Sequence, residues 1–84
     1  MSFKLVPKPV TKYIKDKQPS LEDLQEMVGG YIQVISIGNK QIIVDEEGKI
    51  KDKPVNVEAS DVWGVNYDLI VGDAVVLSDD ALLT

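Results

Sequence analysis

The sequence contains no cysteine, no histidine and no arginine, since all nine of its basic residues are lysine. Without cysteine and histidine, the chain lacks disulfides, the usual zinc sites and nucleophile–histidine catalysis. Without arginine, it cannot hold a phosphate or carboxylate in a bidentate fork. Most catalytic mechanisms are therefore excluded, and we expect a protein that is not an enzyme and uses no cofactor.

Long hydrophobic runs are also missing, and only five of the 84 residues are aromatic. No stretch approaches the roughly 18 apolar residues of a membrane span, and residues 1–8 lack the apolar core of a signal peptide. We therefore predict a single domain over residues 1–84 in the cytoplasm, with no membrane partner. A chain this short has a thin core, so we expect a homo-oligomer, because association would enlarge that core.

The charges are unevenly distributed around a net charge of −5. Residues 1–17 hold five lysines against one acid, whereas residues 43–84 hold three lysines against ten acids. Nucleic-acid backbones require a basic face. The acidic balance therefore argues against non-specific nucleic-acid binding.

The basic N-terminal segment, residues 1–19, contains Pro7 and Pro9, which cannot donate a hydrogen bond to a sheet. We predict one or two short edge strands within residues 3–17. Three lysines fall at even spacing and share one side of such a strand: Lys4, Lys8 and Lys12. They either protect an edge strand from aggregation or form an anion-binding lip.

A short helix is predicted over residues 20–28, because Ser20 is a typical N-cap and one apolar stripe follows it. The stripe consists of Leu21, Leu24 and Val28. Gly29 and Gly30 end the helix. Their first interpretation is a C-cap, and the alternative is close approach of a ligand to their backbone amides. Gly72 allows the same two interpretations, as a bend or as a ligand contact.

The β-branched stretches predict the sheet. Residues 31–37 are apolar on both faces and predict a central strand, with residues 41–44 as its hairpin partner. We further expect a second hairpin into residues 49–51, a loop with at most one helical turn over 55–67, a strand within 68–77, and a tail over 78–84. The predicted fold class is α+β, a small, mainly antiparallel sheet of about four or five strands with one short helix packed on it.

Four acids cluster in the predicted turn: Asp45, Glu46, Glu47 and Asp52. Their spacing does not fit an EF-hand, because a lysine replaces one oxygen ligand and the glycine comes too early. We interpret them as a solvated turn and predict no metal site.

The aperiodic segment contains the residues best suited to bind a ligand, because binding groups concentrate on loops. Trp63, with Tyr67 nearby, is either core packing or a platform for a base. Asn56 either contacts a ribose or base edge, or bonds the backbone of a turn.

Several motifs occur in a characteristic order: a helix followed by Gly-Gly-Tyr-Ile at residues 29–32, Asp-Glu-Glu-Gly-Lys at 45–49, Pro-Val-Asn at 54–56 and Val-Gly-Asp at 71–73. In these features the chain resembles a family of small uncharacterised proteins of bacteria and their phages, and residues 20–77 form the family-like core. The resemblance implies the bacterial host cytoplasm during infection as the setting. In size and lack of catalytic residues the chain also resembles phage proteins that sequester nucleotide-derived immune signals.

By that analogy, we expect an anti-defence protein that binds a cyclic ADP-ribose isomer or a cyclic dinucleotide without cleaving it, in a pocket between subunits. Stacking is expected from Tyr31, Trp63 and Tyr67, and polar contacts from Asn56 and Gln33. Phosphate contacts are expected from the amides of Gly29, Gly30 and Gly72 and from Lys4, Lys8 and Lys12.

A different function also fits the sequence. The acidic residues 43–84 would then dock on a basic host protein, as an inhibitor or nucleic-acid mimic.

Overall fold

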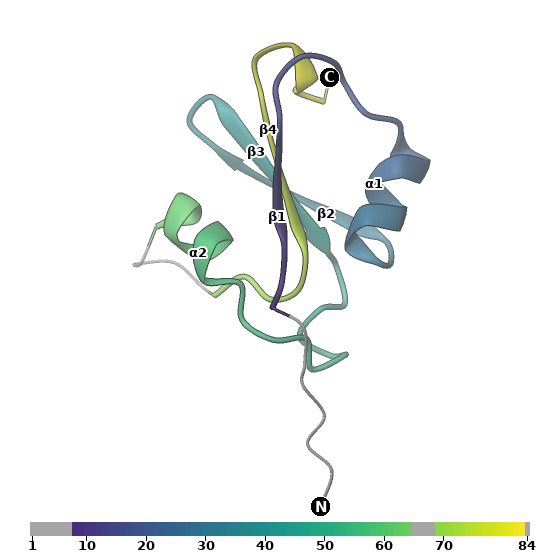
Figure 1. The fold of residues 1–84 in the computed structure, drawn as a ribbon, viewed down its shortest axis with the longest axis vertical. Helices are drawn as coiled ribbons and strands as arrows, with labels where there is room; N and C mark the ends of the chain where they lie inside the picture. The colour runs from purple at the N-terminus through teal and green to yellow at the C-terminus, as the bar shows by residue number, and fades with distance from the viewer. Residues whose placement is uncertain (1–7, 65–68, 84) are drawn as a thin grey trace, which may run out of the picture.

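The computed structural model describes residues 8–64 and 69–83, which form a mixed sheet between two helices (Figure 1). The strands are β1 (Thr11–Ile14), β2 (Ile32–Ile37), β3 (Lys40–Asp45) and β4 (Ala74–Ser78), in the order β1-β4-β3-β2. The helices are α1 (Leu21–Val28) and α2 (Val57–Trp63), followed by a 3₁₀ turn, η1 (Asp79–Ala81). The predicted small α+β fold is confirmed. One of its strand pairs, β1 with β4, is parallel.

The predicted ends of α1 are confirmed. The Ser20 hydroxyl accepts a hydrogen bond from the Asp23 backbone N–H at 3.1 Å, which satisfies one of the free donors of the first turn. Gly29 ends the helix with a φ of +81° and donates its N–H to the Gln25 carbonyl at 2.8 Å. This left-handed conformation is the one that favours glycine at a C-cap.

The buried face of α1 differs from the predicted stripe at one position. Leu24 and Val28 are fully buried, but Leu21 is 57% exposed. Met27 packs against the core instead, as a partly buried side chain. The apolar stripe of α1 therefore consists of Leu24, Met27 and Val28, and it does not include the first residue of the helix.

The prediction of residues 31–37 as a central strand was wrong, because β2 pairs only with β3 within the described part of the chain and lies at an edge of the sheet. Its apolar residues on both faces have another cause, since each face of the sheet carries its own helix. Ile32 packs against the core cluster that contains α1 residues, whereas Ile35 and Ile37 pack against the cluster that contains Ala59 of α2. The predicted hairpin with β3 is present, and Gly38 makes its turn at a φ of +53°.

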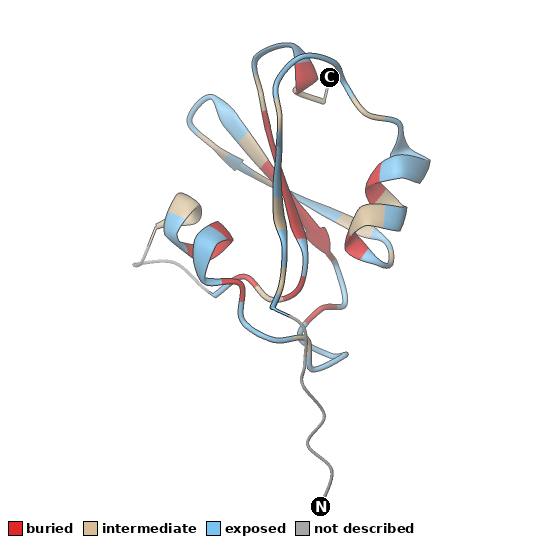
Figure 2. Ribbon diagram, viewed as in Figure 1, coloured by how far each residue is buried: buried red, intermediate tan, exposed pale blue. Residues whose placement is uncertain are grey.

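The two sides of the sheet form separate cores (Figure 2). Under α1, Leu24 packs with Ile43 and Leu77; under α2, Ala59 packs with Ile42 and Val76. The buried strands are β3 and β4, which lie in the middle of the sheet. Alternate side chains of each central strand thus supply the two cores.

The second predicted hairpin was also wrong, because residues 46–52 form consecutive turns and no strand at 49–51. The segment 55–67 is more ordered than predicted: its described part contains the two-turn helix α2.

The predicted tail packs against the core along residues 78–83. Ala81 is fully buried, and Leu82 and Leu83 pack beside it. The Gln41 side chain holds the chain end by donating to the Leu83 carbonyl at 3.2 Å and accepting from the Leu83 N–H at 2.7 Å.

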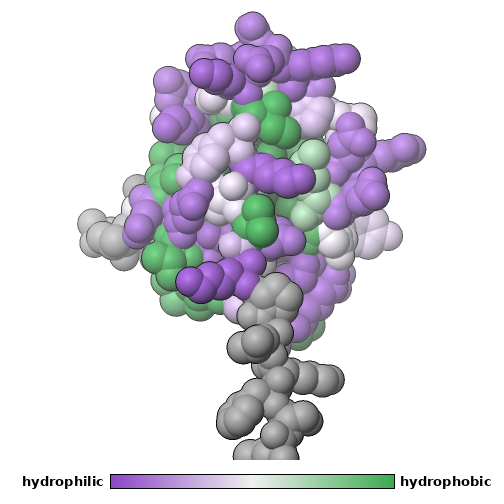
Figure 3. Space-filling view, viewed as in Figure 1, coloured by the Kyte–Doolittle hydropathy of each residue, from purple (hydrophilic) through white to green (hydrophobic). Residues whose placement is uncertain are grey.

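The N-terminal edge of the sheet is β1, a single edge strand in the described part of the predicted segment. Val10 donates to the Asp73 carboxylate at 2.8 Å and accepts from the Ala74 N–H at 3.0 Å. Figure 3, which looks onto the molecule with β1 in front of β4, shows mainly hydrophilic residues with smaller hydrophobic patches between them. Among the described residues, no helix is long and apolar enough to cross a membrane.

Candidate ligand-binding site

Two pockets lie at the end of the sheet where β2 begins and β3 ends. The first, of about 160 Å³, is lined by Trp63 of α2, Gln33 and Ile35 of β2, and Lys49; we call it the Trp63 pocket. The second, of about 300 Å³, is lined by Gln25, Gly30, Tyr31, Glu47 and Lys51; we call it the Tyr31 pocket.

The two pockets share neighbouring backbone. The Tyr31 carbonyl accepts a hydrogen bond from the Glu46 N–H at 2.8 Å, which extends the β2–β3 ladder by one pair. Glu46 lines the Trp63 pocket, and the next residue, Glu47, lines the Tyr31 pocket. Tyr31 is 69% exposed, whereas Trp63 is partly buried against the α2-side core. Each pocket thus combines an aromatic ring, a side-chain amide, a lysine and a carboxylate.

A third pocket, of about 450 Å³, lies between α1, β1 and β4. Among the described residues that line it, Lys12 is the only lysine, beside three acids, Asp23, Glu26 and Asp73. These carboxylates oppose an anionic ligand. The structure therefore places Lys12 where a phosphate is disfavoured.

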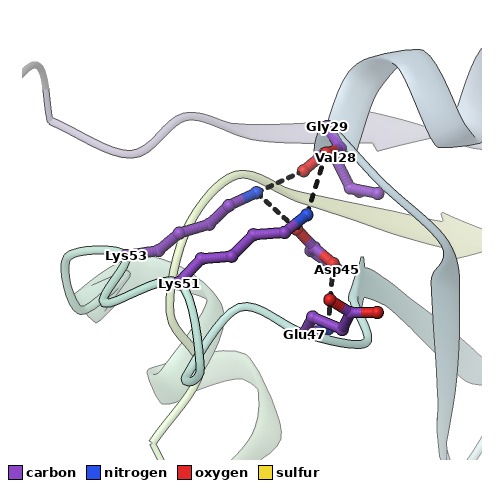
Figure 4. A network of polar contacts seen from close by, with 6 residues as sticks. All are labelled: Val28, Gly29, Asp45, Glu47, Lys51 and Lys53. Carbon is purple, nitrogen blue, oxygen red and sulfur yellow. Dashed lines mark hydrogen bonds and ion pairs between the residues drawn. The ribbon is translucent and has the colours of Figure 1, made fainter.

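A buried carboxylate organises the turns beside the Tyr31 pocket (Figure 4). Asp45 at the end of β3 forms ion pairs with Lys51 at 2.9 Å and Lys53 at 2.7 Å. The same ammonium groups donate to the last carbonyls of α1, at Gly29 over 3.3 Å and Val28 over 2.7 Å. The negative end of the α1 dipole and the Asp45 carboxylate are therefore neutralised together.

The prediction that these acids are solvated was wrong for Asp45, whose side chain is 1% exposed. Burial alone would raise the pKa of Asp45. The hydrogen bonds from Lys53 and Lys51 and from the Glu47 N–H outweigh burial and lower that pKa to about 2. Asp45 in turn raises the pKa of Lys51. Asp45 is a charged structural group at neutral pH.

Gly30 leaves space for this network of charged side chains. A Cβ built on Gly30 would lie 2.8 Å from the Lys51 Nζ and 2.9 Å from the Asp45 Oδ1. A side chain at this position would therefore displace the Lys51 ammonium group and the Asp45 carboxylate.

Asn56 is 2% exposed and sits between three segments of the chain. Its side-chain oxygen accepts from the Thr11 hydroxyl and from the Ala59 N–H, both at 3.0 Å, and so caps α2. Its side-chain nitrogen donates to the Gly72 carbonyl at 3.0 Å. The structure places Asn56 inside the fold, with both ends of its side-chain amide bonded to other parts of the chain.

The three glycine amides proposed for phosphate binding have partners within the fold. Gly29 and Gly30 both donate to the Gln25 carbonyl, and Gly72 donates to the Pro54 carbonyl at 2.7 Å. Gly29 and Gly72 have positive φ values, as expected for a C-cap and a bend.

The structure thus brings together two pairs of the predicted site residues, Gln33 with Trp63 in one pocket and Gly30 with Tyr31 in the other. Lys8 is exposed on the chain before β1, and Tyr67 and Lys4 lie outside the described residues. Sequence reasoning missed Lys49 and Lys51 as pocket residues. Within residues 8–64 and 69–83, no group of acids is arranged to hold a metal ion.

Comparison with protein families gives one match: the family described as Domain of unknown function (DUF3846), over residues 3–82. The curated proteins and the solved structures give no match.

Proposed function

This chain belongs to the DUF3846 family, whose description states no function, and on that premise we propose that it binds a nucleotide-derived small molecule and sequesters it uncleaved. The observation that carries the proposal is the pairing of Trp63 and Tyr31 in two pockets at one end of β2. Aromatic rings stack on nucleobases with little dependence on base identity.

The two pockets differ in size, so each would hold a different part of the ligand. At about 160 Å³, the Trp63 pocket is below the usual range of about 300 to 1,000 Å³ for small-molecule sites. It has room for a base, with the Gln33 amide at its edge. The Tyr31 pocket, at about 300 Å³, would take the sugar or a second base.

The charges around the pockets favour some groups of such a ligand over others. Lys49 and Lys51 provide ammonium donors for phosphate, as point charges without the geometry of an arginine fork. Glu46 and Glu47 accept hydrogen bonds from ribose hydroxyls or exocyclic amines and repel phosphate. We expect affinity to reflect a balance between these lysines and acids.

Sequestration is preferred over catalysis because the sequence holds no imidazole, thiol or guanidinium group. The resemblance to small phage proteins supplies the setting, the bacterial cytoplasm during infection. A cyclic ADP-ribose isomer or a cyclic dinucleotide is the ligand class that we propose, with the protein acting as an anti-defence sponge.

Trp63 provides the direct test, because it is the only tryptophan of the chain. We expect cyclic dinucleotides, cyclic ADP-ribose isomers or ordinary nucleotides to quench its fluorescence in a saturable titration, and to raise the melting temperature by mass action. Heat-denatured complex should release the ligand chemically unchanged. If none of these compounds changes either signal, the proposed function is wrong; release of a cleaved product would refute sequestration.

Two exposed tyrosines provide a matched pair of variants. Tyr31 is 69% exposed and lines a pocket, whereas Tyr13 is 58% exposed on β1 at the opposite edge of the sheet. Tyr31→Ala should weaken binding about fivefold or more, because stacking on one base contributes about 1–3 kcal/mol. Tyr13→Ala should bind as the wild type does. Equal affinities of the two variants would exclude Tyr31 from the site.

The two acids provide a second test with the opposite sign. Glu46→Gln and Glu47→Gln should tighten binding of a phosphate-bearing ligand, since each removes a negative charge from a pocket wall. The effect should shrink as salt is added. Weaker binding by both variants would contradict this expectation, because the hydrogen bonds that these acids accept from the ligand would then outweigh their repulsion of phosphate.

A further inference from the structure

We propose that two copies of this chain pair through the free edges of β2, antiparallel about a two-fold axis at Val34, to form one continuous eight-stranded sheet. The proposal rests on the β2 edge and is independent of any ligand.

The β2–β3 register identifies the backbone groups on the free edge. The Tyr31 carbonyl accepts a hydrogen bond from the Glu46 N–H. Hydrogen-bonded pairs alternate along an antiparallel ladder, so Gln33, Ile35 and Ile37 also direct their N–H and C=O groups toward β3. The groups that point away from β3 therefore belong to Ile32, Val34 and Ser36. On this edge β2 has no neighbouring strand among the described residues.

The side chains of β2 lack the features that normally protect an edge. All six residues, Ile32–Ile37, are uncharged, and none is proline. Val34, at the centre, is 42% exposed. Natural edge strands usually carry lysine, proline or a bulge that prevents pairing with another chain.

The opposite edge has those features. β1 carries Lys12, and the residues around it include Lys8, Pro9 and Lys15. The same sheet thus has one protected edge and one edge without protection, which indicates that the β2 edge has a partner.

A second copy fits this edge because β2 is complementary to itself about Val34. Antiparallel pairing with Val34 opposite Val34 uses the three outward residues of each copy and forms six backbone hydrogen bonds, two at each facing pair. Ile32 then faces the smaller Ser36 of the other copy, and Gln33 faces Ile35. No charged side chain is placed opposite another, so the interface carries no repulsion.

This assembly ends at two copies. Each β2 has only one free edge, and the outer strands of the joined sheet are the two lysine-bearing β1 strands. A two-fold axis closes the interface on itself. The result is a dimer and not a fibre.

Sedimentation of the wild type and two charge variants tests the interface. We expect the wild type to sediment at twice the 9.3 kDa chain mass. Val34→Lys should sediment as a monomer, because it places two ammonium groups directly opposite each other. Tyr13→Lys adds the same charge at an exposed position of β1 and should remain a dimer. Unchanged circular dichroism would show that both variants fold.

Cysteine cross-linking tests the register, because the chain contains no other cysteine. In a Val34→Cys variant, the two Cα atoms would lie about 5.5 Å apart, within disulfide range, and oxidation should give a covalent dimer. Ser36→Cys is the matched control, on the same face of the same strand. Its counterpart lies four residues along the facing strand, about 13 Å away or more, and should not cross-link.

The outcomes separate this proposal from the proposed function. A monomeric wild type at high micromolar concentration, or a Val34→Lys variant that stays dimeric, would overturn the β2 interface. Efficient cross-linking of Ser36→Cys without Val34→Cys would overturn the register. All of these measurements are made without nucleotide, so a failure to bind nucleotide leaves them unaffected.

Discussion

Asp45 and Asn56 are two buried polar residues that organise different halves of the molecule. Asp45 holds the turns at 46–53 against the end of α1, through two lysines. Asn56 joins β1, α2 and the bend at Gly72, through neutral hydrogen bonds. Asn56 bonds a distant backbone carbonyl directly, at Gly72, whereas Asp45 acts through its lysines, which donate to the last carbonyls of α1.

The difference between the two lies in their charge. A neutral amide keeps its hydrogen bonds at every ordinary pH, whereas a carboxylate loses its ion pairs once it is protonated. The pocket end of the sheet therefore depends on acidity through Asp45. The β1–α2 end has no such dependence at Asn56.

The largest effect is expected from Asn56→Ala. The variant removes the cap of α2 and leaves the buried Gly72 carbonyl without its donor, at a combined cost of about 3 kcal/mol in unfolding free energy. Urea denaturation measures this loss. Asn56→Asp is the control, because it keeps the capping oxygen but removes the donor to Gly72, and it should also be destabilised. A loss below about 1 kcal/mol in Asn56→Ala would contradict the role of Asn56 as the junction.

Asp45→Asn should destabilise the protein somewhat less, by about 2 kcal/mol. The amide cannot neutralise Lys51 and Lys53, but both ammonium groups keep their helix carbonyls and remain partly exposed. Thermal or urea unfolding at pH 7 measures the difference. Wild-type stability in this variant would show that the ion pairs contribute nothing net.

The wild type should lose a similar amount of stability in acid. The folded pKa of Asp45 is about 2, below its ordinary value of 3.8. Stability from this group is therefore complete above about pH 5 and is lost as the pH falls through 4 toward 2, by about 2 kcal/mol in total. The comparison should be made against Asp45→Asn, because other carboxyls also titrate there. If the two proteins show parallel pH profiles, Asp45 is not the linked group.

The smallest effects are expected from the single lysine variants. Lys53→Met should cost about 1 kcal/mol, because the Lys53 side chain is 22% exposed and lies 2.7 Å from both Asp45 and the Val28 carbonyl. Lys51→Met should cost less, since Lys51 is 39% exposed and its contacts are longer. The reverse order would mean that the partner at the Gly29 carbonyl matters more than burial does.

Local chemistry made part of the fold predictable. Ser20 and Gly29 end α1 through interactions within a few residues, and Gly38 turns the β2–β3 hairpin in the same way. The predictions that failed concern features set by contacts between residues far apart in the sequence. The position of β2 at the edge is set by β4 pairing with both β3 and β1, and no local pattern in residues 31–37 encodes that order.

The candidate site was predictable to a similar extent. Trp63 and Gln33 belong to different elements and line the same pocket only because α2 packs on the sheet. Their residue types alone were enough to select them as candidate site residues. Asn56 was identified by type as well, but its burial follows from its contact with Thr11, 45 residues earlier. The spacing of Lys51 and Lys53 is a sequence signal that was missed. Alternate lysines after an acidic turn can both reach back to one carboxylate, here Asp45.

The parallel pairing of β1 with β4 has a consequence for how the chain is made. Thr11 faces Ala74, so β1 leaves the ribosome well before the strand on which it docks. Through the synthesis of some sixty intervening residues it has no neighbouring strand among the described residues, and closing so long a loop makes its docking on β4 a slow, late step. Lysines at positions 8, 12 and 15 keep this waiting segment hydrated until the C-terminal strand arrives.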